Sequence, residues 1–409
     1  MRIAIVNEGL GYPPNAGNKI RTLNLMLPLA GRHEITYICR GTADPAEAAE
    51  ARAFYAAHGI RAIITQDHAK QKRGVGFYAR LAGNLLSPLP FSIATHNSAN
   101  VRTAVRTLAA HEHIDVWQFE APGYADVLHG TPARTVVMAH NVESLIWQRL
   151  CETERHPLKR LYIGHQWSKY ERFERRILSA ADRVVAVTDE DAALFRTRFG
   201  IERVDVVDNG VDLKFFSEVE RTRSADPRSI LFLGSLDWRP NLDSLDSLVN
   251  QILPVVRARV PDATLTIVGR NPPASLARMV RGVPGVELHA NVPDVRPFLR
   301  RAGVMAVPLR IGGGSRLKIL EAAASGVPVV STRIGSEGLA FNDGTEMVIV
   351  DDVSGMADAL VASMRHPGLA AQRASEALRV VRSRYDWKGL ADRLEVVWES
   401  VAAAAPKPR

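Results

Sequence analysis

The chain has 409 residues, of which 46% are hydrophobic and 23% charged, with a formal net charge of +8. This length exceeds what one hydrophobic core usually covers, so the composition predicts two globular domains. The basic balance favours anionic partners, but it does not choose among nucleotides, nucleic acid and anionic lipid, and a solvated basic surface explains it equally well.

The ends and the cysteines of the chain exclude several other classes of protein. No apolar run approaches the roughly 20 residues that span a bilayer, and Glu8 interrupts the N-terminus before a signal-like core could form. Cys39 and Cys151 lie far apart and match no metal or redox spacing. We therefore expect a cytoplasmic protein with ordinary buried thiols and without a disulfide framework.

Short β-branched runs alternate with helical stretches in two successive series. The predicted strands are 2–7, 34–40, 115–120, 134–141, 183–188 and 204–210, followed by 229–236, 263–270, 286–292, 303–310 and 327–332. This alternation predicts parallel βα units with helices on both faces of each sheet. We expect an α/β protein with two Rossmann-like domains, 1–210 and 228–385, facing each other across a cleft, joined by a polar linker at 211–227.

The stretch "RIGGGSRLKILEAAASGVPVVST" combines glycines, cations and one carboxylate. The residues of interest are Gly312, Gly313, Gly314, Ser315, Arg316, Lys318 and Glu321. A glycine loop before a helix N-terminus is a site for anions, here with Ser315 as the expected N-cap. Glu321, about 9 Å along the helix from Ser315, suits a ribose. The stretch predicts a clamp for a sugar-nucleotide diphosphate; the alternative is a glycine turn before a core helix with a surface ion pair.

The segment 156–178 interleaves Lys and Arg with Leu, Tyr, Trp and Phe at helical spacing. It either lies on an anionic membrane that presents a lipid-linked acceptor or packs its aromatic side chains into the N-terminal domain. Residues 70–86 present the same choice. Asp351 and Asp352 follow a strand far from the glycine stretch, so we read them as a solvated strand end and expect no metal site.

Six motifs together resemble the family 4 glycosyltransferases of the GT-B fold. They are "NAGNKIRTLNLMLPLA", "AHNVES", "VDNGVD", "VPDATLTIVGR", "PDVRPFLRRAGVMAVPL" and the glycine stretch with "IGSEGL" after it. The resemblance covers nearly the whole chain. It implies a metal-independent, retaining transferase without a cofactor, with the nucleotide-sugar donor in the C-terminal domain and the acceptor in the N-terminal one. It also implies that a terminal helix, 386–409, crosses back to the N-terminal domain.

The family motifs place site residues in both domains. Gly17 and Asn18 match the loop over the donor, Asn15 and Asn141 belong to the acceptor side, and His140 matches the histidine beside the donor sugar. At a strand's carboxyl end, His140 suits orientation of the reacting groups, although a lone histidine is more often structural. Glu120, also at a strand end, is a candidate for orienting the acceptor.

Two departures from the family pattern concern the donor. Gly313 stands where a second glutamate is usual, eight positions before Glu321, so backbone N–H groups would replace that acid. Ser235 and Pro240 stand at or near the usual arginine and lysine of the phosphate-binding pair. Arg239, Arg316 and Lys318 are the substitutes that the sequence offers.

The sequence thus predicts a glycosyltransferase that moves a sugar from a UDP- or GDP-linked donor to a glycan or lipid-linked acceptor in bacterial surface or exopolysaccharide biosynthesis. We expect no nucleic-acid partner, and peripheral contact with the inner face of the cytoplasmic membrane. Two alternatives stay open. One is a sugar-nucleotide 2-epimerase of the same fold, and the other is a catalytically silent nucleotide-binding or scaffold protein, suggested by Gly313.

Overall fold

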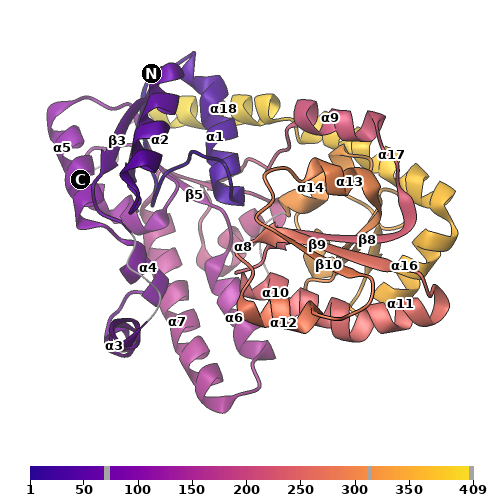
Figure 1. The fold of residues 1–409 in the computed structure, drawn as a ribbon. Coiled ribbons are helices and arrows are strands. Elements are labelled where there is room, and N and C mark those ends of the chain that lie inside the picture. Colours follow the sequence, from indigo (N-terminus) through magenta and orange to yellow (C-terminus); the bar gives the residue numbers. More distant parts are fainter. Residues whose placement is uncertain (69–73, 312–315, 405–409) are drawn as a thin grey trace. The chain divides into compact units, whose positions relative to one another are not determined.

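The computed structural model describes residues 1–68, 74–311 and 316–404. They form two compact units, which are coloured along the chain in Figure 1. The N-terminal unit comprises Met1–Asp208 and Lys388–Arg409, and the C-terminal unit comprises Asn209–Trp387. Of the residues predicted for the glycine clamp, 312–315 lie outside the described part.

The N-terminal unit is built on a parallel seven-stranded sheet of order β3-β2-β1-β4-β5-β6-β7. Its strands are β1 (Arg2–Val6), β2 (Glu34–Arg40), β3 (Arg61–Thr65), β4 (Val116–Phe119), β5 (Thr135–Ala139), β6 (Arg183–Ala186) and β7 (Val204–Val206). Its helices are α1 (Gly17–Ala30), α2 (Pro45–Ala57), α3 (Val75–Asn84), α4 (Phe91–His96), α5 (Ala99–His111), the 3₁₀ turn η1 (Pro122–Leu128), α6 (Glu143–Thr153), α7 (Pro157–Ala180), α8 (Asp189–Phe199) and α18 (Trp387–Ala403).

Local sequence signals explain where several of these helices begin and end. Ser98 and Thr188 accept hydrogen bonds from the first turns of α5 and α8, which fixes the start of each helix. Gly200 ends α8 in the left-handed conformation at φ 70°. The helix α18 returns to this unit, where Trp398 Nε1 donates to Gln118 Oε1 at 2.7 Å on β4.

The C-terminal unit is built on a parallel six-stranded sheet of order β10-β9-β8-β11-β12-β13. Its strands are β8 (Asp226–Ser235), β9 (Thr264–Arg270), β10 (Val286–Ala290), β11 (Ala302–Val307), β12 (Val329–Thr332) and β13 (Val348–Val350). Its helices are α9 (Leu213–Arg221), α10 (Arg239–Ser247), the π turn η2 (Leu248–Ile252), α11 (Leu253–Arg259), α12 (Ala274–Val280), α13 (Arg296–Arg301), α14 (Leu317–Ala324), α15 (Arg333–Ser336), α16 (Met356–Arg365) and α17 (Pro367–Arg384).

Both faces of the C-terminal sheet are covered, as expected for parallel strands. Alternate residues of β8 enter opposite cores: Leu231 and Leu233 pack with α9, α13, α14 and α17, whereas Ile230 and Phe232 pack with α10, α11, α12 and α16. Figure 1 shows α13 and α14 on one side of β8 to β10, with α10 and α12 on the other. The strand order changes direction at β8: β9 and β10 follow on one side of it, and β11, β12 and β13 follow on the other.

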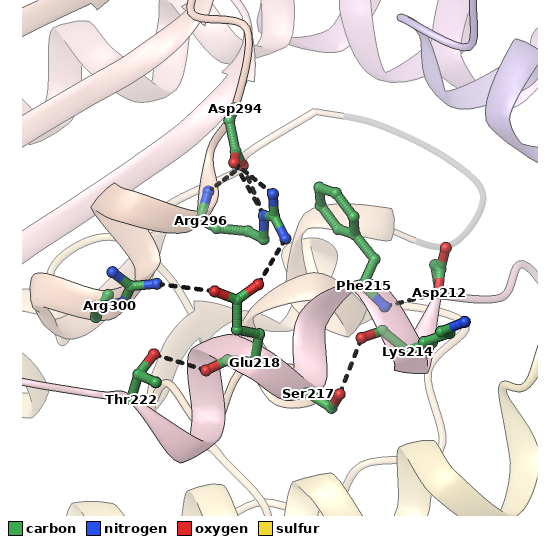
Figure 2. A network of polar contacts seen from close by, with 9 residues as sticks. All are labelled: Asp212, Lys214, Phe215, Ser217, Glu218, Thr222, Asp294, Arg296 and Arg300. Carbon is green, nitrogen blue, oxygen red and sulfur yellow. Dashed lines mark hydrogen bonds and ion pairs between the residues drawn. The ribbon is translucent and has the colours of Figure 1, made fainter.

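The segment 211–227, predicted as a polar linker, lies within the C-terminal unit, Asn209–Trp387. This segment holds the helix α9, whose Phe216 and Val219 are buried in the core of the C-terminal unit. Figure 2 shows how charged side chains join α9 to α13: Glu218 pairs with Arg296 at 3.0 Å and with Arg300 at 3.7 Å. The segment looks polar because α9 is amphipathic and its exposed face is charged. The strand β8 begins at Asp226, which also lies within the predicted linker.

One strand escaped the sequence prediction. The missed strand, β3, pairs with β2 at the edge of the N-terminal sheet, and its side chains are partly exposed instead of forming a buried apolar run. Edge strands lack the continuous hydrophobic pattern that identifies central parallel strands. Of the two cysteines, Cys39 is buried in β2 as predicted, whereas Cys151 on α6 is only partly buried.

Candidate functional site

Each unit carries a group of polar side chains at the carboxyl edge of its sheet, where open parallel sheets bind ligands. We name each group after one of its residues, a histidine in the first and a lysine in the second. The histidine cluster of the N-terminal unit comprises Arg21, Thr22, Gln118, Glu120 and His140. The lysine cluster of the C-terminal unit comprises Ser235, Asn241, Arg270, Lys318 and Glu321.

The histidine cluster is centred on a carboxylate that lies immediately after β4. Glu120 Oε2 lies 3.0 Å from His140 Nε2, which follows β5, and accepts a hydrogen bond from Thr22 Oγ1 on α1 at 3.1 Å. Its other oxygen accepts from Gln118 Nε2 at 2.6 Å. The side chain of Glu120 is 1% exposed and that of His140 is 24% exposed. The two predicted catalytic residues are therefore in contact, and only His140 reaches the surface.

The environment keeps Glu120 ionised. Burial alone would raise the pKa of this carboxyl, but the hydrogen bond and charge of His140, the charge of Arg21 and the bond from Gln118 outweigh burial and lower it. Burial lowers the pKa of the Arg21 guanidinium to about 10, so that it stays protonated at neutral pH. Because an ionised carboxylate only accepts hydrogen bonds, Nε2 of His140 carries a proton. In the neutral tautomer with its proton on Nε2, Nδ1 is the hydrogen-bond acceptor of this partly exposed side chain.

The predicted acceptor-side residues lie on two segments of the same unit. Asn15, predicted on the acceptor side, is exposed in the loop before α1. Gly17 and Asn18, which were predicted to lie over the donor, are the exposed first residues of that helix. Asn141 follows His140 and donates to Glu143 Oε1 at 3.0 Å. Glu143 is a second acid close enough to His140 to interact with its charge. Burial raises the pKa of the Glu143 carboxyl.

The lysine cluster gathers around the end of β8. Lys318 Nζ on α14 donates to Asn241 Oδ1 at 2.9 Å and lies 4.6 Å from the centre of the Phe232 ring. Asn241 in turn donates to the carbonyl oxygen of Ser235 at 2.8 Å. A Cβ at 234 would lie 2.6 Å from Asn241 Nδ2 and 2.9 Å from Lys318 Nζ, so any larger residue there would have to displace these two side chains.

Lys318 and Glu321 lie three residues apart on α14. The pKa of Lys318 is lowered and the pKa of Glu321 is raised. Burial, and then the charge of Arg316, lower the pKa of Lys318 to about 7. Burial raises the pKa of Glu321 to about 7, against the effect of Lys318. Both groups lie partly buried and lack the hydration that would favour their charged forms. An anion beside Lys318 would stabilise the charged ammonium, and hydroxyl donors beside Glu321 would stabilise the charged carboxylate.

The other predicted donor residues are placed less closely together. Arg316 is the N-cap of α14, one residue later than the predicted cap; it is buried, and its guanidinium lies 3.5 Å from the Ile334 carbonyl oxygen. Arg239 is the exposed first residue of α10. Gly312, Gly313, Gly314 and Ser315 lie outside the described residues. Within the described residues, no group of three or more His, Cys, Asp or Glu could hold a metal ion.

Sequence reasoning missed residues whose role depends on pairing between distant strands. Gln118, Arg21 and Thr22 complete the histidine cluster, and Asn241 and Arg270 complete the lysine cluster. One signal was available for Gln118, since it is a polar residue inside the buried strand "VWQF". Arg270 stands at the carboxyl end of a predicted strand, the position at which His140 was recognised.

Comparisons with known proteins agree with this architecture. The family model "Glycosyltransferase Family 4" matches residues 19–215, and "Glycosyl transferases group 1" matches residues 227–366. The structure also resembles the Anabaena protein Alr3699/HepE, solved in complex with UDP-glucose, with a TM-score of 0.64 at 15% identity. That alignment covers 98% of this chain and 100% of the other. The chain belongs to the family 4 glycosyltransferases, which share the GT-B fold.

Relatives of known sequence are similar over different lengths. A phosphatidyl-myo-inositol mannosyltransferase of Mycolicibacterium smegmatis is 29% identical over 54% of this chain. The matched region spans only 58% of that relative, little more than half of its length. An uncharacterized 44.6 kDa protein in the cps region of Klebsiella pneumoniae is 21% identical over 95% of this chain and 97% of its own length.

Proposed function

We propose that this chain transfers a sugar from a nucleotide-sugar donor to a glycan or lipid-linked acceptor, with retention of the anomeric configuration and without a metal ion. The observation that carries the proposal is the placement of Lys318 and Glu321 one helical turn apart on α14, with Lys318 held at the end of β8 by Asn241. A cation and an acid one helical turn apart match the two ends of a ribosyl diphosphate. Family membership supports the same reaction.

The donor is a UDP- or GDP-linked sugar. Lys318 binds the diphosphate, and Glu321 accepts hydrogen bonds from the ribose hydroxyls. A protein of the same fold was solved with UDP-glucose, which supports a UDP-linked donor. The predicted contributions of Arg239, Arg316 and the glycine loop 312–315 belong to this donor site.

His140 is the residue of the N-terminal unit that meets the substrates. Its exposed edge offers a nitrogen that orients an acceptor hydroxyl or the donor sugar. Glu120 acts through His140, because its carboxylate is buried and holds three hydrogen-bonded partners. A carboxylate in this position is a poor nucleophile. Retention therefore depends on orientation and on stabilising the departing phosphate, without a covalent intermediate on Glu120.

The acceptor is presented at an anionic membrane surface, the inner face of the cytoplasmic membrane, during assembly of a bacterial surface polysaccharide. The C-terminal half of α7 packs into its unit through Tyr170 and Phe173, but the first turns expose Leu158 and Leu161 at 72% and 74%. His165 Nε2 contacts the carbonyl oxygen of Leu85 at 3.2 Å, which brings the segment after α3 alongside α7. Leu86 in that segment is 94% exposed.

Basic side chains accompany these leucines. Lys159 and Arg160 lie between Leu158 and Leu161 and are exposed. Exposed leucines beside cations suit binding to the interface of an anionic bilayer. Among the helices of the described ranges, none is long and apolar enough to cross a membrane. The relative from a cps region supports a place in polysaccharide assembly.

A thermal-shift screen tests the proposal at the level of the donor. Nucleoside diphosphates and their sugar conjugates should raise the melting temperature, because a ligand that binds only the native state stabilises it by RT ln(1 + [L]/Kd). We expect stabilisation by UDP or GDP forms, and a loss of that shift in Glu321→Ala. Stabilisation by no nucleotide at all would favour the scaffold alternative.

A further inference from the structure

Arg270 is the last residue of β9 and the member of the lysine cluster that comes from this strand. Arg270 and Ser235, the last residue of β8, are register partners in the parallel pair. The Arg270 guanidinium donates from NH2 to Ser235 Oγ at 3.0 Å. This contact directs the Arg270 side chain along the sheet edge toward the end of β8. Lys318 lies near the same strand end, because it is linked to Ser235 through Asn241.

The backbone that carries Arg270 is held on both sides. Gly269 faces Gly234 so closely that a Cβ at 269 would lie 1.9 Å from the Gly234 carbonyl oxygen. Leu236 N donates to the Arg270 carbonyl oxygen at 2.8 Å. Asn271 follows in the left-handed conformation at φ 53°, and its N–H donates to Asn291 Oδ1 at 2.9 Å. The strand end is therefore a fixed base for the guanidinium.

Among the described residues, no carboxylate neutralises the charge of Arg270. Another arginine near this edge, Arg310, forms two hydrogen bonds with the carboxylate of Asp243, at 2.9 and 2.5 Å. Arg270 is partly exposed, and in residues 1–68, 74–311 and 316–404 it has no carboxylate partner. A guanidinium held by a hydroxyl keeps most of its five N–H groups for a ligand, and its planar shape matches phosphate oxygens.

Two cations thus converge on one residue from different elements. Lys318 reaches Ser235 through Asn241, which donates to the Ser235 carbonyl oxygen, and Arg270 reaches its hydroxyl. Lys318 carries a compact ammonium group over the Phe232 ring, whereas Arg270 carries a planar guanidinium group at the end of β9. A ligand with two neighbouring phosphate groups satisfies both, whereas a single carboxylate or sulfate would leave one cation without a partner.

We propose that Arg270 is a second phosphate-binding cation of the donor site, acting with Lys318 on the diphosphate, and that Ser235 positions it. This inference rests on the proposed function, since it takes the ligand of the lysine cluster to be a nucleotide diphosphate. Arg270 adds a bidentate contact that Lys318 cannot make. It therefore sets the preference of the site for diphosphates over monophosphates and nucleosides.

Calorimetric titration with uridine, UMP and UDP, and with the guanosine series in parallel, tests the proposal. Arg270→Ala should weaken diphosphate binding about tenfold to a hundredfold, as expected for a lost charge-assisted hydrogen bond, and change nucleoside binding by less than about twofold. Arg278→Ala removes an equal charge from the exposed face of α12 and serves as the matched control with unchanged affinities.

A rescue variant separates a phosphate contact from a structural role. Because residues 235 and 270 are side by side, Ser235→Arg combined with Arg270→Ala moves the guanidinium by one strand and should recover most of the diphosphate affinity. Equal losses for nucleoside and diphosphate, or no loss in Arg270→Ala, would overturn the inference while leaving the proposed function intact. A wild-type protein that binds neither UDP nor GDP would sink both.

Discussion

At the scale of single residues, the proposed function gives different roles to the buried carboxylate of Glu120 and to the partly exposed His140. Glu120 is ionised, fixed by partners from α1, β4 and the segment after β5, and shielded from solvent. It can orient His140, but it cannot reach an acceptor. Orientation of reacting groups contributes several orders of magnitude to a reaction without a strong nucleophile, so the cost of losing it appears in the rate.

We predict that His140→Ala lowers the rate of sugar transfer by about a hundredfold or more while the affinity for the nucleotide donor changes little. The measurement is kcat for transfer together with calorimetric Kd for the nucleoside diphosphate. His113→Ala, at an exposed histidine of the same unit, should be neutral in both. A folded His140→Ala protein with wild-type turnover would make His140 a structural residue.

The second residue-scale prediction concerns Lys318. With its pKa lowered to about 7, the ammonium is mostly deprotonated near pH 8 in the free protein. A bound diphosphate favours the charged form and raises that pKa, so binding takes up a proton, up to about one per ligand. Affinity for inorganic pyrophosphate should therefore fall as the pH rises above about 7.

Titration with pyrophosphate in two buffers of different ionisation enthalpy measures this uptake. Pyrophosphate has no ribose and makes no ribose contact with Glu321, but the titrations of Lys318 and Glu321 are coupled, so the experiment is run in the Glu321→Gln background. The uptake should vanish in Lys318→Met, which keeps the length of the side chain without the charge. Equal heats in both buffers for the Glu321→Gln protein would show that Lys318 does not bind the phosphates.

The predictability of single residues follows from how local their signal is. His140, Glu120, Lys318 and Glu321 were predicted because each stands at a strand end or in a glycine-to-helix stretch. Arg270 and Asn241 were not predicted, since their partners Ser235 and Lys318 are set by strand register and helix packing. A single sequence does not contain these long-range contacts in a readable form.

At the scale of elements, α9 shows that a charged segment can belong to a hydrophobic core. Phe215 and Phe216 are neighbours, but Phe215 is 38% exposed under Arg296, whereas Phe216 is 6% exposed in the core. Figure 2 shows the Phe215 ring beside the ion pairs of Glu218. The polar surface of the helix led the sequence analysis to a linker, although "LKFFSEVER" carries an apolar stripe.

We predict that Phe216→Ala destabilises the C-terminal unit by about 3–5 kcal/mol, the usual cost of removing a buried phenylalanine. Phe215→Ala should cost about 1 kcal/mol or less, because its ring is half exposed and loses mainly a surface cation–π contact. Urea denaturation of the two variants measures the difference. Similar small losses would mean that α9 is the flexible linker that the sequence suggested.

The first turns of α7 carry the membrane prediction. Binding of the wild-type protein to vesicles should require anionic lipid and weaken as salt rises, because screening shortens the Debye length to about 8 Å at physiological ionic strength. Leu158→Ser with Leu161→Ser should reduce binding about tenfold or more, as two exposed leucines lose their insertion. Leu369→Ser, at an exposed leucine of α17, is the control. Binding to neutral vesicles alone, or to none, would refute this role for α7.

At the scale of the whole molecule, the two sheets follow from the repeated alternation of apolar strands and helices. The central strands are buried on both faces and read as near-continuous apolar runs, so they were predicted almost to the residue. The edge strand β3 and the helix α9 were missed because exposure dilutes their patterns. The family resemblance, carried by motifs at the strand ends, indicated the GT-B fold, and the comparisons show it.

The most direct test of the central claim is NMR of a reaction that contains the protein, a nucleotide sugar and an acceptor extract, with EDTA present throughout. The account predicts release of nucleoside diphosphate that depends on the acceptor, and a new glycoside whose anomeric proton keeps the configuration of the donor. Inversion would contradict the retaining mechanism, and a requirement for added Mg²⁺ or Mn²⁺ would contradict metal independence. Conversion of the donor to its 2-epimer without transfer, or no turnover with any donor, would contradict the assignment as a glycosyltransferase.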